Sequence, residues 1–346
     1  PYFFARYFEK ECANMHGVYG AFMKALNAKQ CPDPDTFIAH VGFGTLGLLH
    51  TDFQTIPRIG FFELFYDPFK AKEDNRQEYP LPKPNQIRIP LRNATSLVEL
   101  LYCTKGYSPT PYQRSTFPQE FQHKLTTLFD GIDTNFYQPG TISNNSSLQI
   151  TWPHDAPIIT FVSRGLEAYR GFDYFMEVAH EVSLKNKDVH FVIAGRPQTH
   201  YGNEMTVIKD ASFKEYVLKQ RPYDLNRFHF MDWIPEAALN DLFKLSACHF
   251  YWTTPFTLSW SLFQAMSSGC LVMGSNTAPV RDLVQHNENG LLVDPNNKQM
   301  MAEMMLNILG NPQQYQPLRV AARETVTAQY GFDTCLPKLT EFYLNN

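Results

Sequence analysis

The chain has 346 residues, of which 44% are hydrophobic and 18% charged, and its formal net charge at pH 7 is −4. This length predicts about two domains, with a core large enough to fold without disulfides or a structural metal. A mildly acidic chain lacks the basic surface that holds nucleic-acid phosphates, and no run approaches the roughly 20 apolar residues of a membrane span. We therefore expect neither nucleic-acid binding nor a transmembrane segment.

The N-terminal half shows a sparse α/β pattern. It begins without an initiator methionine or a signal-peptide pattern, so we expect the first domain to lack an N-terminal segment. A helix is predicted over residues 7–26 and a shorter one over 45–53. Residues 67–90 are rich in charge and proline, which predicts a long exposed loop. The predicted strands are residues 36–41, 59–65, 97–102 and 125–129.

The C-terminal half alternates regularly from residue 157 onward. Apolar strand-like runs cover residues 158–163, 189–195, 228–233, 249–253, 271–275 and 291–294. Helices are predicted over 174–183, 213–220, 236–246, 258–268 and 280–286. This alternation is typical of a parallel sheet covered by helices on both faces. A polar run at 139–147 is the best linker candidate, so the chain is predicted as two α/β domains in tandem.

Neither the cysteines nor the paired acidic residues predict a metal site. The six cysteines form no Cys-x-x-Cys pair and do not cluster with histidines, a usage that fits a reducing cytoplasm. Asp33-Pro34-Asp35 spells the D-x-D of metal-dependent sugar transferases. Because a proline separates the two carboxylates ahead of a strand, a turn is the better interpretation.

A glycine-rich motif near the front permits a different function. Gly42-Phe43-Gly44-Thr45-Leu46-Gly47 matches G-x-G-x-x-G after a predicted strand, and Glu63 lies in the next strand. This pattern is close to the fingerprint of NAD-type oxidoreductases. However, that fingerprint usually follows the first strand of its domain, whereas here a helix comes first. His40 precedes the motif at the end of an apolar strand, where it is either a ligand-binding residue or a half-buried structural histidine.

The second domain contains several motifs in a specific order. Phe161-Val162-Ser163-Arg164-Gly165-Leu166-Glu167-Ala168-Tyr169-Arg170-Gly171 follows its first strand, and Thr254-Pro255-Phe256-Thr257-Leu258-Ser259-Trp260-Ser261-Leu262-Phe263-Gln264-Ala265-Met266 joins two later elements. Residues 274–280 and 288–294 follow. These blocks resemble the donor domain of family 4 glycosyltransferases, and most closely a bacterial branch with "SRGLEPYRG" and "PFVLSWSLLEAMA" at these places. The first domain resembles the family more weakly, through residues 39–44 and 63–66.

The resemblance implies the GT-B fold, in which two Rossmann-like domains with parallel sheets face a cleft. It implies a first, acceptor-side domain over 1–142, a linker over 143–156, a donor-binding domain over 157–323, and a C-terminal helix over 324–346 that returns to the first domain. The implied reaction is a retaining, metal-independent transfer from a nucleotide sugar, such as a UDP- or GDP-sugar, without a cofactor. The resemblance does not identify the acceptor, which could be a glycan, a lipid, a small molecule or a protein. It is also compatible with peripheral contact with a membrane.

The resemblance also implies roles for individual residues. Arg164 and Arg170 would stabilise the charge of the departing diphosphate, and either surface solvation or an ion pair with Glu167 is the alternative interpretation. His40 would orient the donor rather than act as a nucleophile, and Glu63 would lie on the acceptor side. The implied donor-binding positions are Gly42, Gly44, Trp233, Phe256, Thr257, Leu258, Ser259 and Gln264.

Two positions depart from the family pattern. Members commonly carry Glu-x7-Glu, in which the first acid contacts the sugar and the second the ribose, but this chain has Phe256 and Gln264 there. Phenylalanine at the first position is shared with the resembling branch. The amide of Gln264 can still bond to ribose hydroxyls, although without charge assistance. A non-catalytic relative that binds a nucleotide sugar is therefore the alternative, ahead of the oxidoreductase.

Overall fold

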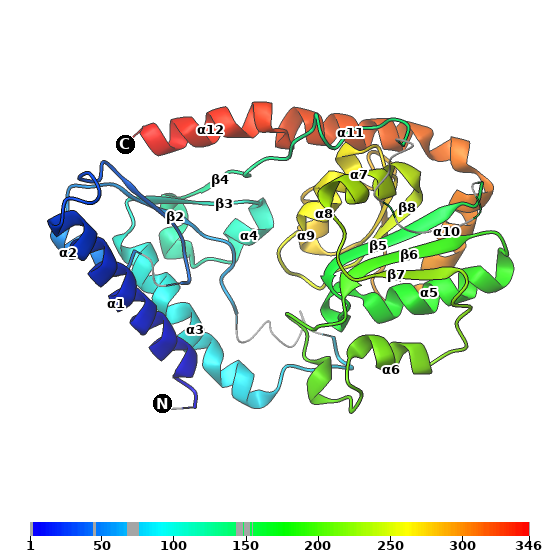
Figure 1. Ribbon diagram of the computed structural model, residues 1–346, viewed down its shortest axis with the longest axis horizontal. Coiled ribbons are helices and arrows are strands. Elements are labelled where there is room, and N and C mark those ends of the chain that lie inside the picture. Colours follow the sequence, from blue (N-terminus) through cyan, green and yellow to red (C-terminus); the bar gives the residue numbers. More distant parts are fainter. Residues whose placement is uncertain are drawn as a thin grey trace. The chain divides into compact units, whose positions relative to one another are not determined.

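A computed structural model describes residues 3–43, 46–67, 76–142, 148, 153 and 155–345. The chain forms two compact units, each with its own parallel sheet (Figure 1). Unit 1 comprises Pro1–Asp74, Leu81–Asp130 and Leu336–Asn346, and unit 2 comprises Asn75–Pro80 and Gly131–Cys335. Most of the predicted linker, 143–156, lies outside the described residues.

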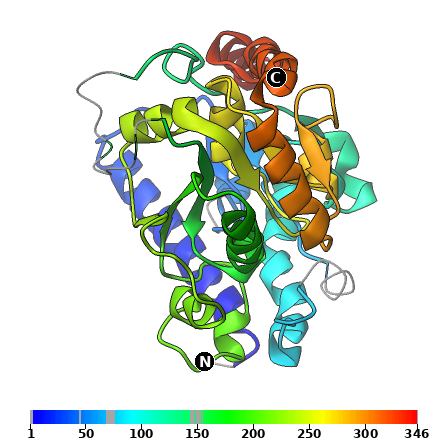
Figure 2. The same cartoon turned by 90° about the vertical axis from the view of Figure 1, so that its right-hand side faces the viewer.

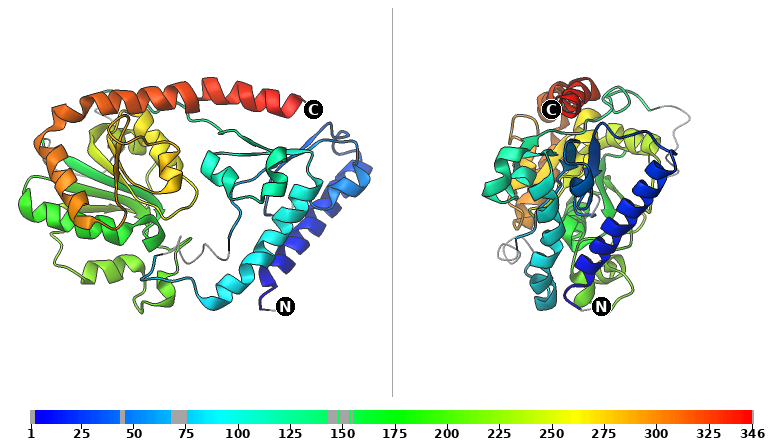
Figure 3. Two further views of the ribbon diagram at one scale, coloured as in Figure 1. Left: turned by 180° about the vertical axis from the view of Figure 1, so that it is seen from behind. Right: turned by 90° about the vertical axis from the view of Figure 1, so that its left-hand side faces the viewer.

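Unit 1 contains a four-stranded parallel sheet in the order β1-β2-β3-β4. Its strands are β1 (Phe37–His40), β2 (Arg58–Phe61), β3 (Lys105–Ser108) and β4 (Leu125–Thr127). Its helices are α1 (Arg6–Asn27), α2 (Leu49–Asp52), α3 (Lys83–Tyr102), α4 (Pro111–Ser115) and the C-terminal part of α12 (Phe332–Leu344). Helices α1 and α3 lie side by side (Figure 3). The predicted helix over 7–26 and the strands at 36–41, 59–65 and 125–129 are confirmed.

Helix α3 overturns two of the sequence predictions. Residues 97–102, predicted as a strand, are the last turns of this helix, and the loop predicted over 67–90 gives way to helix at Lys83. Pro84 lies in the first turn, where its missing N–H costs nothing, and Pro90 is accommodated inside the helix. The prolines therefore led to a wrong prediction of a loop. The burial of one face of α3 stabilises the helix by more than its prolines destabilise it. That face includes Ile89, Asn93, Ser96 and Leu100.

The end of α12 packs on the unit 1 sheet. Leu339 is buried with Ile59 and Tyr107, and the Tyr343 hydroxyl lies 2.6 Å from the Tyr107 hydroxyl. The region predicted as one C-terminal helix, 324–346, contains the end of α11 (Gln316–Tyr330) and then α12. The C-terminal part of α12 thus contributes Leu339, Phe342 and Tyr343 to the core of unit 1.

Unit 2 contains a six-stranded parallel sheet in the order β10-β9-β8-β5-β6-β7. Its strands are β5 (Ile158–Gly165), β6 (His190–Arg196), β7 (Phe228–Met231), β8 (Ser246–Tyr251), β9 (Val272–Ser275) and β10 (Leu291–Val293). Its helices are α5 (Phe172–Lys185), α6 (Phe213–Lys219), α7 (Glu236–Leu245), α8 (Trp260–Ser267), α9 (Ala278–Arg281), α10 (Lys298–Gly310) and α11. Helices α5 and α10 lie side by side (Figure 2). Every strand predicted in this half is confirmed, and the strand order is that of a doubly wound nucleotide-binding sheet.

The core of unit 2 is rich in aromatic side chains. Phe161 and Phe191 on the sheet pack with Phe172 and Phe175 on α5, and each is at most 2% exposed. Near-continuous apolar strands are expected for a parallel sheet that is covered on both faces. This rigid sheet supports the loops at the carboxyl ends of its strands. Among the described residues, no helix is both long and apolar enough to cross a membrane.

Candidate active site

The donor-binding residues predicted in the second half of the chain belong to unit 2, and the arginine and loop motifs follow strands at the carboxyl edge of its sheet. Gly42, which was predicted with them, belongs to unit 1. The strand order reverses between β5 and β8, and open α/β sheets bind ligands in the crevice at such a point. Arg164 lies near the end of β5, and Arg170 ends the short 3-10 turn that follows. Residues 252–259 follow β8. The topology therefore brings the arginine motif and the loop motif to one place.

Arg170 is a buried cation. Its side chain is 8% exposed, and its Nη1 donates to the Thr253 hydroxyl at 2.9 Å and to the Thr257 carbonyl at 3.0 Å. Its guanidinium carbon lies 5.2 Å from the centre of the Phe256 ring. Within the described part of the chain, Arg170 forms no ion pair with a carboxylate. Burying a charge without an opposite charge is unfavourable, so this position favours an anionic ligand.

Arg164 and Arg170 both approach Tyr201. Arg164 is exposed, and its Nη1 lies 3.4 Å from the Tyr201 hydroxyl. The guanidinium carbon of Arg170 lies 5.7 Å from the centre of the same ring. The structure thus places the two predicted arginines around one tyrosine, which the sequence did not single out. Tyr201 follows β6 in a loop without a recognisable motif, so no sequence signal marked it.

Glu167 holds the Tyr201 loop instead of pairing with an arginine. Its side chain is fully buried, and its Oε2 accepts the backbone N–H groups of His200, Tyr201 and Gly202 at 2.7, 2.8 and 3.3 Å. The alternative interpretation from the sequence, an ion pair between Glu167 and the arginines, is therefore wrong. The carboxylate fixes the loop, and the arginine charges are left for another partner.

The loop after β8 places the remaining donor motif. Helix α8 begins at Trp260, later than predicted, and Ser259 caps it by accepting the Ser261 N–H at 3.3 Å. The Ser259 N–H donates to the Tyr251 hydroxyl at 2.8 Å. Thr257 is buried, and Leu258 is half-buried.

The two departures from the family pattern lie on different elements. Phe256 is 5% exposed and packs against the rings of Tyr169 and Tyr201, with ring centres 5.2 and 5.0 Å apart. Gln264 is half-buried on α8, and the described residues offer its side chain no hydrogen-bond partner. Phe256 is thus a part of the Arg170 surroundings, whereas the Gln264 amide keeps its hydrogen-bonding capacity.

A hollow of about 410 Å³ opens in unit 2 beside these residues. Its lining includes Arg164 and the predicted donor-binding positions Ser259 and Trp233, and Trp233 is 68% exposed. Arg196 and His200 line it as well, although neither belongs to a motif that the sequence analysis selected. Arg196 is the last residue of β6, and His200 lies in the loop after it. Their position at the carboxyl end of a strand was therefore the signal that could have found them. The hollow is large enough for a nucleobase.

A smaller pocket of about 80 Å³ lies in unit 1, and the predicted residues His40, Gly42 and Glu63 line it. His40 ends β1 and Glu63 follows β2, and the parallel register pairs His40 with Phe61. His40 Nε2 therefore lies 3.7 Å from Glu63 Oε2, with both side chains substantially exposed. Arg92 on α3 also lines the pocket, stacked on the Tyr66 ring with its guanidinium carbon 3.7 Å from the ring centre. Arg92 lies between the predicted loop at 67–90 and the predicted strand at 97–102, so it belongs to no element predicted from the sequence.

A side chain of the protein itself accepts the hydrogen bonds of the glycine-rich turn. The N–H groups of Gly42 and Leu46 each donate to the Glu99 carboxylate at 2.9 Å, and Glu99 is 1% exposed. Gly42 needs to be glycine because its φ is +93°. Gly44 and Thr45 lie outside the described residues. A buried carboxylate that fills these donors would repel a pyrophosphate, which argues against NAD binding at this turn.

Two family models match separate parts of the chain. The model of the glycosyl transferase family 4 group matches residues 1–137, and that of glycosyl transferases group 1 matches residues 156–311. Among curated proteins, a GDP-mannose-dependent alpha-(1-6)-phosphatidylinositol monomannoside mannosyltransferase of Mycobacterium tuberculosis is 33% identical over 79 residues. That match covers 23% of this chain and only 20% of the relative.

Solved structures share the fold over most of the chain. Sucrose-phosphate synthase from Thermosynechococcus elongatus aligns with a TM-score of 0.70 at 16% sequence identity. The alignment covers 93% of this chain and 76% of the synthase chain. HepE of Anabaena in complex with UDP-glucose aligns with a TM-score of 0.66 at 13% identity and covers 94% and 81%. At such low identities the likeness concerns the fold alone.

Removing the carboxylate at Glu99 should loosen the glycine-rich turn. We expect Glu99→Gln to lower the free energy of unfolding by about 1–3 kcal/mol, because the amide cannot accept both buried N–H groups with charge assistance. Urea unfolding followed by circular dichroism measures the change. The exposed Glu120 provides the control, and Glu120→Gln should shift stability by less than about 0.5 kcal/mol. Equal stability of both variants would show that Glu99 does not hold the turn.

Proposed function

We propose that this chain, which belongs to the family 4 glycosyltransferases and has their GT-B fold, is a retaining, metal-independent enzyme that uses a nucleoside-diphosphate sugar. The observation that carries the proposal is the buried Arg170 charge, which has no carboxylate partner among the described residues. Arg164 adds a second, exposed charge around the same tyrosine. A diphosphate would supply the missing negative charge.

The arginines act on the leaving group in this proposal. As the bond from the anomeric carbon to the diphosphate breaks, its electron pair stays on the diphosphate, which gains negative charge. Fixed cations and N–H donors aimed at that charge stabilise the transition state more than the ground state. Arg170 is fixed by Thr253 and Thr257, so little reorganisation is needed during the reaction. Arg164 and the N–H groups of Thr257 and Leu258 would complete the diphosphate site.

The remaining substrate contacts follow from the two pockets. We assign the nucleobase to the unit 2 hollow, beside Trp233, and an acceptor of undefined class to the unit 1 pocket, beside Glu63. His40 would donate a hydrogen bond to the donor substrate rather than attack it. The mycobacterial relative is named for GDP-mannose and the HepE structure holds UDP-glucose, so both GDP- and UDP-sugars are candidate donors.

A non-catalytic nucleotide-sugar-binding relative is the second candidate. Its support is that both acidic positions of the family pattern are uncharged here, at Phe256 and Gln264. The two functions differ in turnover, so donor hydrolysis or sugar transfer by the purified chain supports the enzyme. Tight donor binding without either reaction supports the binding protein.

Loss of either arginine should weaken donor binding. A thermal-shift screen with UDP-, GDP- and ADP-sugars first identifies the donor, because a ligand at 100 times its Kd stabilises by about 2.7 kcal/mol. Arg170→Ala and Arg164→Ala should then each weaken donor binding and slow turnover. Where the arginine stabilises charge in the transition state, the loss in kcat/KM should correspond to about 2–4 kcal/mol.

Arg170→Lys should not restore the function of Arg170, because one ammonium group cannot reproduce the hydrogen bonds and aromatic contacts of the guanidinium.

Arg281 on α9 supplies the matched control for this experiment. It is an exposed arginine whose guanidinium bonds only to Asn276 among the described residues, so Arg281→Ala should leave donor affinity unchanged. Isothermal titration with the nucleoside diphosphate selected by the screen compares the variants. Wild-type affinity in both Arg164→Ala and Arg170→Ala would refute the diphosphate site.

Gln264 tests the ribose contact separately. If Gln264 faces the ribose, Gln264→Glu should tighten nucleotide binding, because a carboxylate accepts both ribose hydroxyls with charge assistance. The arginine pair would offset its repulsion from the diphosphate. Titration of both forms with UDP and GDP measures the difference. Equal or weaker binding by the glutamate variant would count against the ribose contact.

A further inference from the structure

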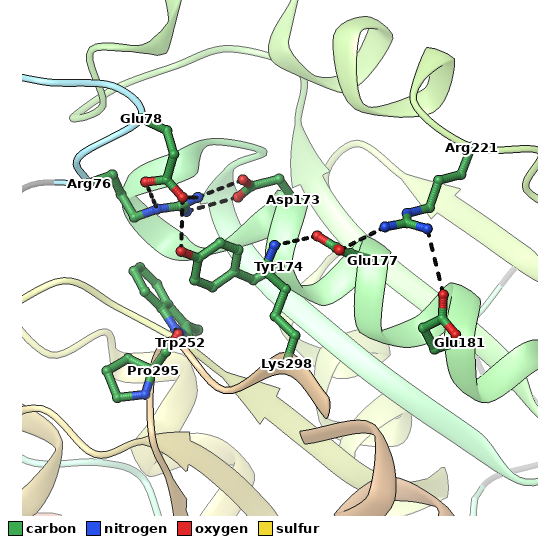
Figure 4. A network of polar contacts seen from close by, with 10 residues as sticks. All are labelled: Arg76, Glu78, Asp173, Tyr174, Glu177, Glu181, Arg221, Trp252, Pro295 and Lys298. Carbon is green, nitrogen blue, oxygen red and sulfur yellow. Dashed lines mark hydrogen bonds and ion pairs between the residues drawn. The ribbon is translucent and has the colours of Figure 1, made fainter. Parts of the chain in front are cut away.

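Arg76 is a fully hydrogen-bonded side chain that lies outside the residues already discussed. It lies in Asn75–Pro80, a segment that belongs to unit 2 although the residues before and after it belong to unit 1. The guanidinium is 7% exposed and uses all of its N–H groups within the described residues. Figure 4 shows it against α5, with Glu78 on one side and Asp173 on the other.

The contacts of Arg76 form two forks. Nη1 and Nη2 donate to the two carboxylate oxygens of Asp173 at 3.0 and 2.7 Å, and Nε and Nη2 donate to those of Glu78 at 3.2 Å each. The guanidinium carbon lies 3.7 Å from the centre of the Tyr174 ring. Burial lowers the pKa of Arg76, but the hydrogen bonds and charge of Asp173 outweigh it and raise the pKa. The cation is therefore permanent and rigidly held.

One further bond connects Arg76 to the candidate active site. Nη1 also donates to the Ala168 carbonyl at 3.1 Å. Ala168 begins the 3-10 turn that Arg170 ends, and Asp173 lies in the first turn of α5 just beyond it. Arg76 thus bonds to both ends of the short segment that carries Arg170.

The segment between these two ends has little freedom. Gly171 has a φ of +71°, and a Cβ there would lie 2.6 Å from the Trp252 ring. The Thr254 N–H donates to the Tyr169 carbonyl at 3.2 Å on the side of the β8 loop. Trp252 packs against Gly171, and Arg76 bonds to Ala168 and Asp173 at the two ends of the segment. These contacts restrict the backbone conformation at Arg170.

We propose that Arg76 is a positioning residue for donor binding, which holds the Ala168–Asp173 segment so that Arg170 meets the diphosphate. The proposal rests on the proposed function of Arg170. Arg76 itself does not touch the substrate in this role, because its donors are all bonded within the protein. Its effect on the nucleotide therefore passes through Arg170, and this route distinguishes positioning from a general contribution to stability.

A double-mutant cycle with Arg170 tests that route. Titration with the nucleoside diphosphate that binds wild type gives the affinities of Arg76→Ala, Arg170→Ala and the double variant. We expect Arg76→Ala alone to weaken binding by about tenfold or more, since small displacements of a binding group are costly. In the Arg170→Ala background the same change should alter affinity by less than about threefold. Asp173→Asn, which keeps the side-chain size, repeats the cycle so that the result does not depend on the folding of Arg76→Ala.

Arg221, which follows α6 and pairs with acids on α5, is the matched control. It pairs with Glu177 and Glu181 of α5 at 2.7 and 3.6 Å (Figure 4). Both acids lie beyond Asp173 along the helix, outside the Ala168–Asp173 segment. Arg221→Ala should lower the thermal midpoint of unfolding as much as Arg76→Ala does, or less. It should leave the nucleotide affinity unchanged. An affinity loss in Arg221→Ala equal to that in Arg76→Ala would overturn positioning and indicate a general stability effect.

The possible results separate this proposal from the proposed function. If Arg170→Ala binds nucleotide like wild type, the diphosphate site itself is wrong. If Arg170→Ala binds weakly but Arg76→Ala and Asp173→Asn bind like wild type, only the positioning role is overturned. Equal losses from Arg76→Ala in both backgrounds overturn it as well, because Arg76 would then act independently of Arg170.

Discussion

The buried charge of Arg170 is the constraint on which the carboxyl edge of unit 2 depends. A guanidinium that is 8% exposed, with no carboxylate partner in the described part of the chain, costs free energy unless an anion meets it. The protein holds the charge with hydroxyl, carbonyl and aromatic groups, none of which neutralises it. Neighbouring carboxylates are bonded elsewhere: Glu167 to backbone N–H groups and Asp173 to Arg76. The arrangement preserves a positive charge for a ligand.

The same device fixes loops in both units. Glu99 accepts two backbone N–H groups of the turn after β1, next to His40, and Glu167 accepts three of the loop that carries Tyr201. A buried carboxylate is stable when it accepts several N–H groups, and it rigidifies the loop that supplies them. Candidate functional residues thus lie on loops that are fixed from inside by acids that do not face the pockets. This explains why an acid in a motif is a poor guide to a catalytic role here.

The sequence predicted unit 2 better than unit 1 for physical reasons. Parallel strands buried on both faces give apolar runs that helices separate, so alternation alone located β5 to β10. In unit 1, α3 carries prolines at both its start and its interior, and its buried face includes Asn93 and Ser96, so neither composition nor periodicity revealed it. The site divides similarly: Arg164 and Arg170 lie in a motif, whereas Tyr201, Arg92 and Arg76 matter through contacts that only folding creates.

The phenylalanine at position 256 gains an explanation from its contact with Arg170. A glutamate at the position of Phe256 would stand close to the buried guanidinium and neutralise part of its charge. The phenylalanine instead contributes an aromatic ring 5.2 Å from the guanidinium carbon, a contact that stabilises a cation without neutralising it. At Gln264, the other departure from the family pattern, the amide likewise carries no negative charge. In the proposed function, the diphosphate of the donor would supply the negative charge that the protein withholds from Arg170.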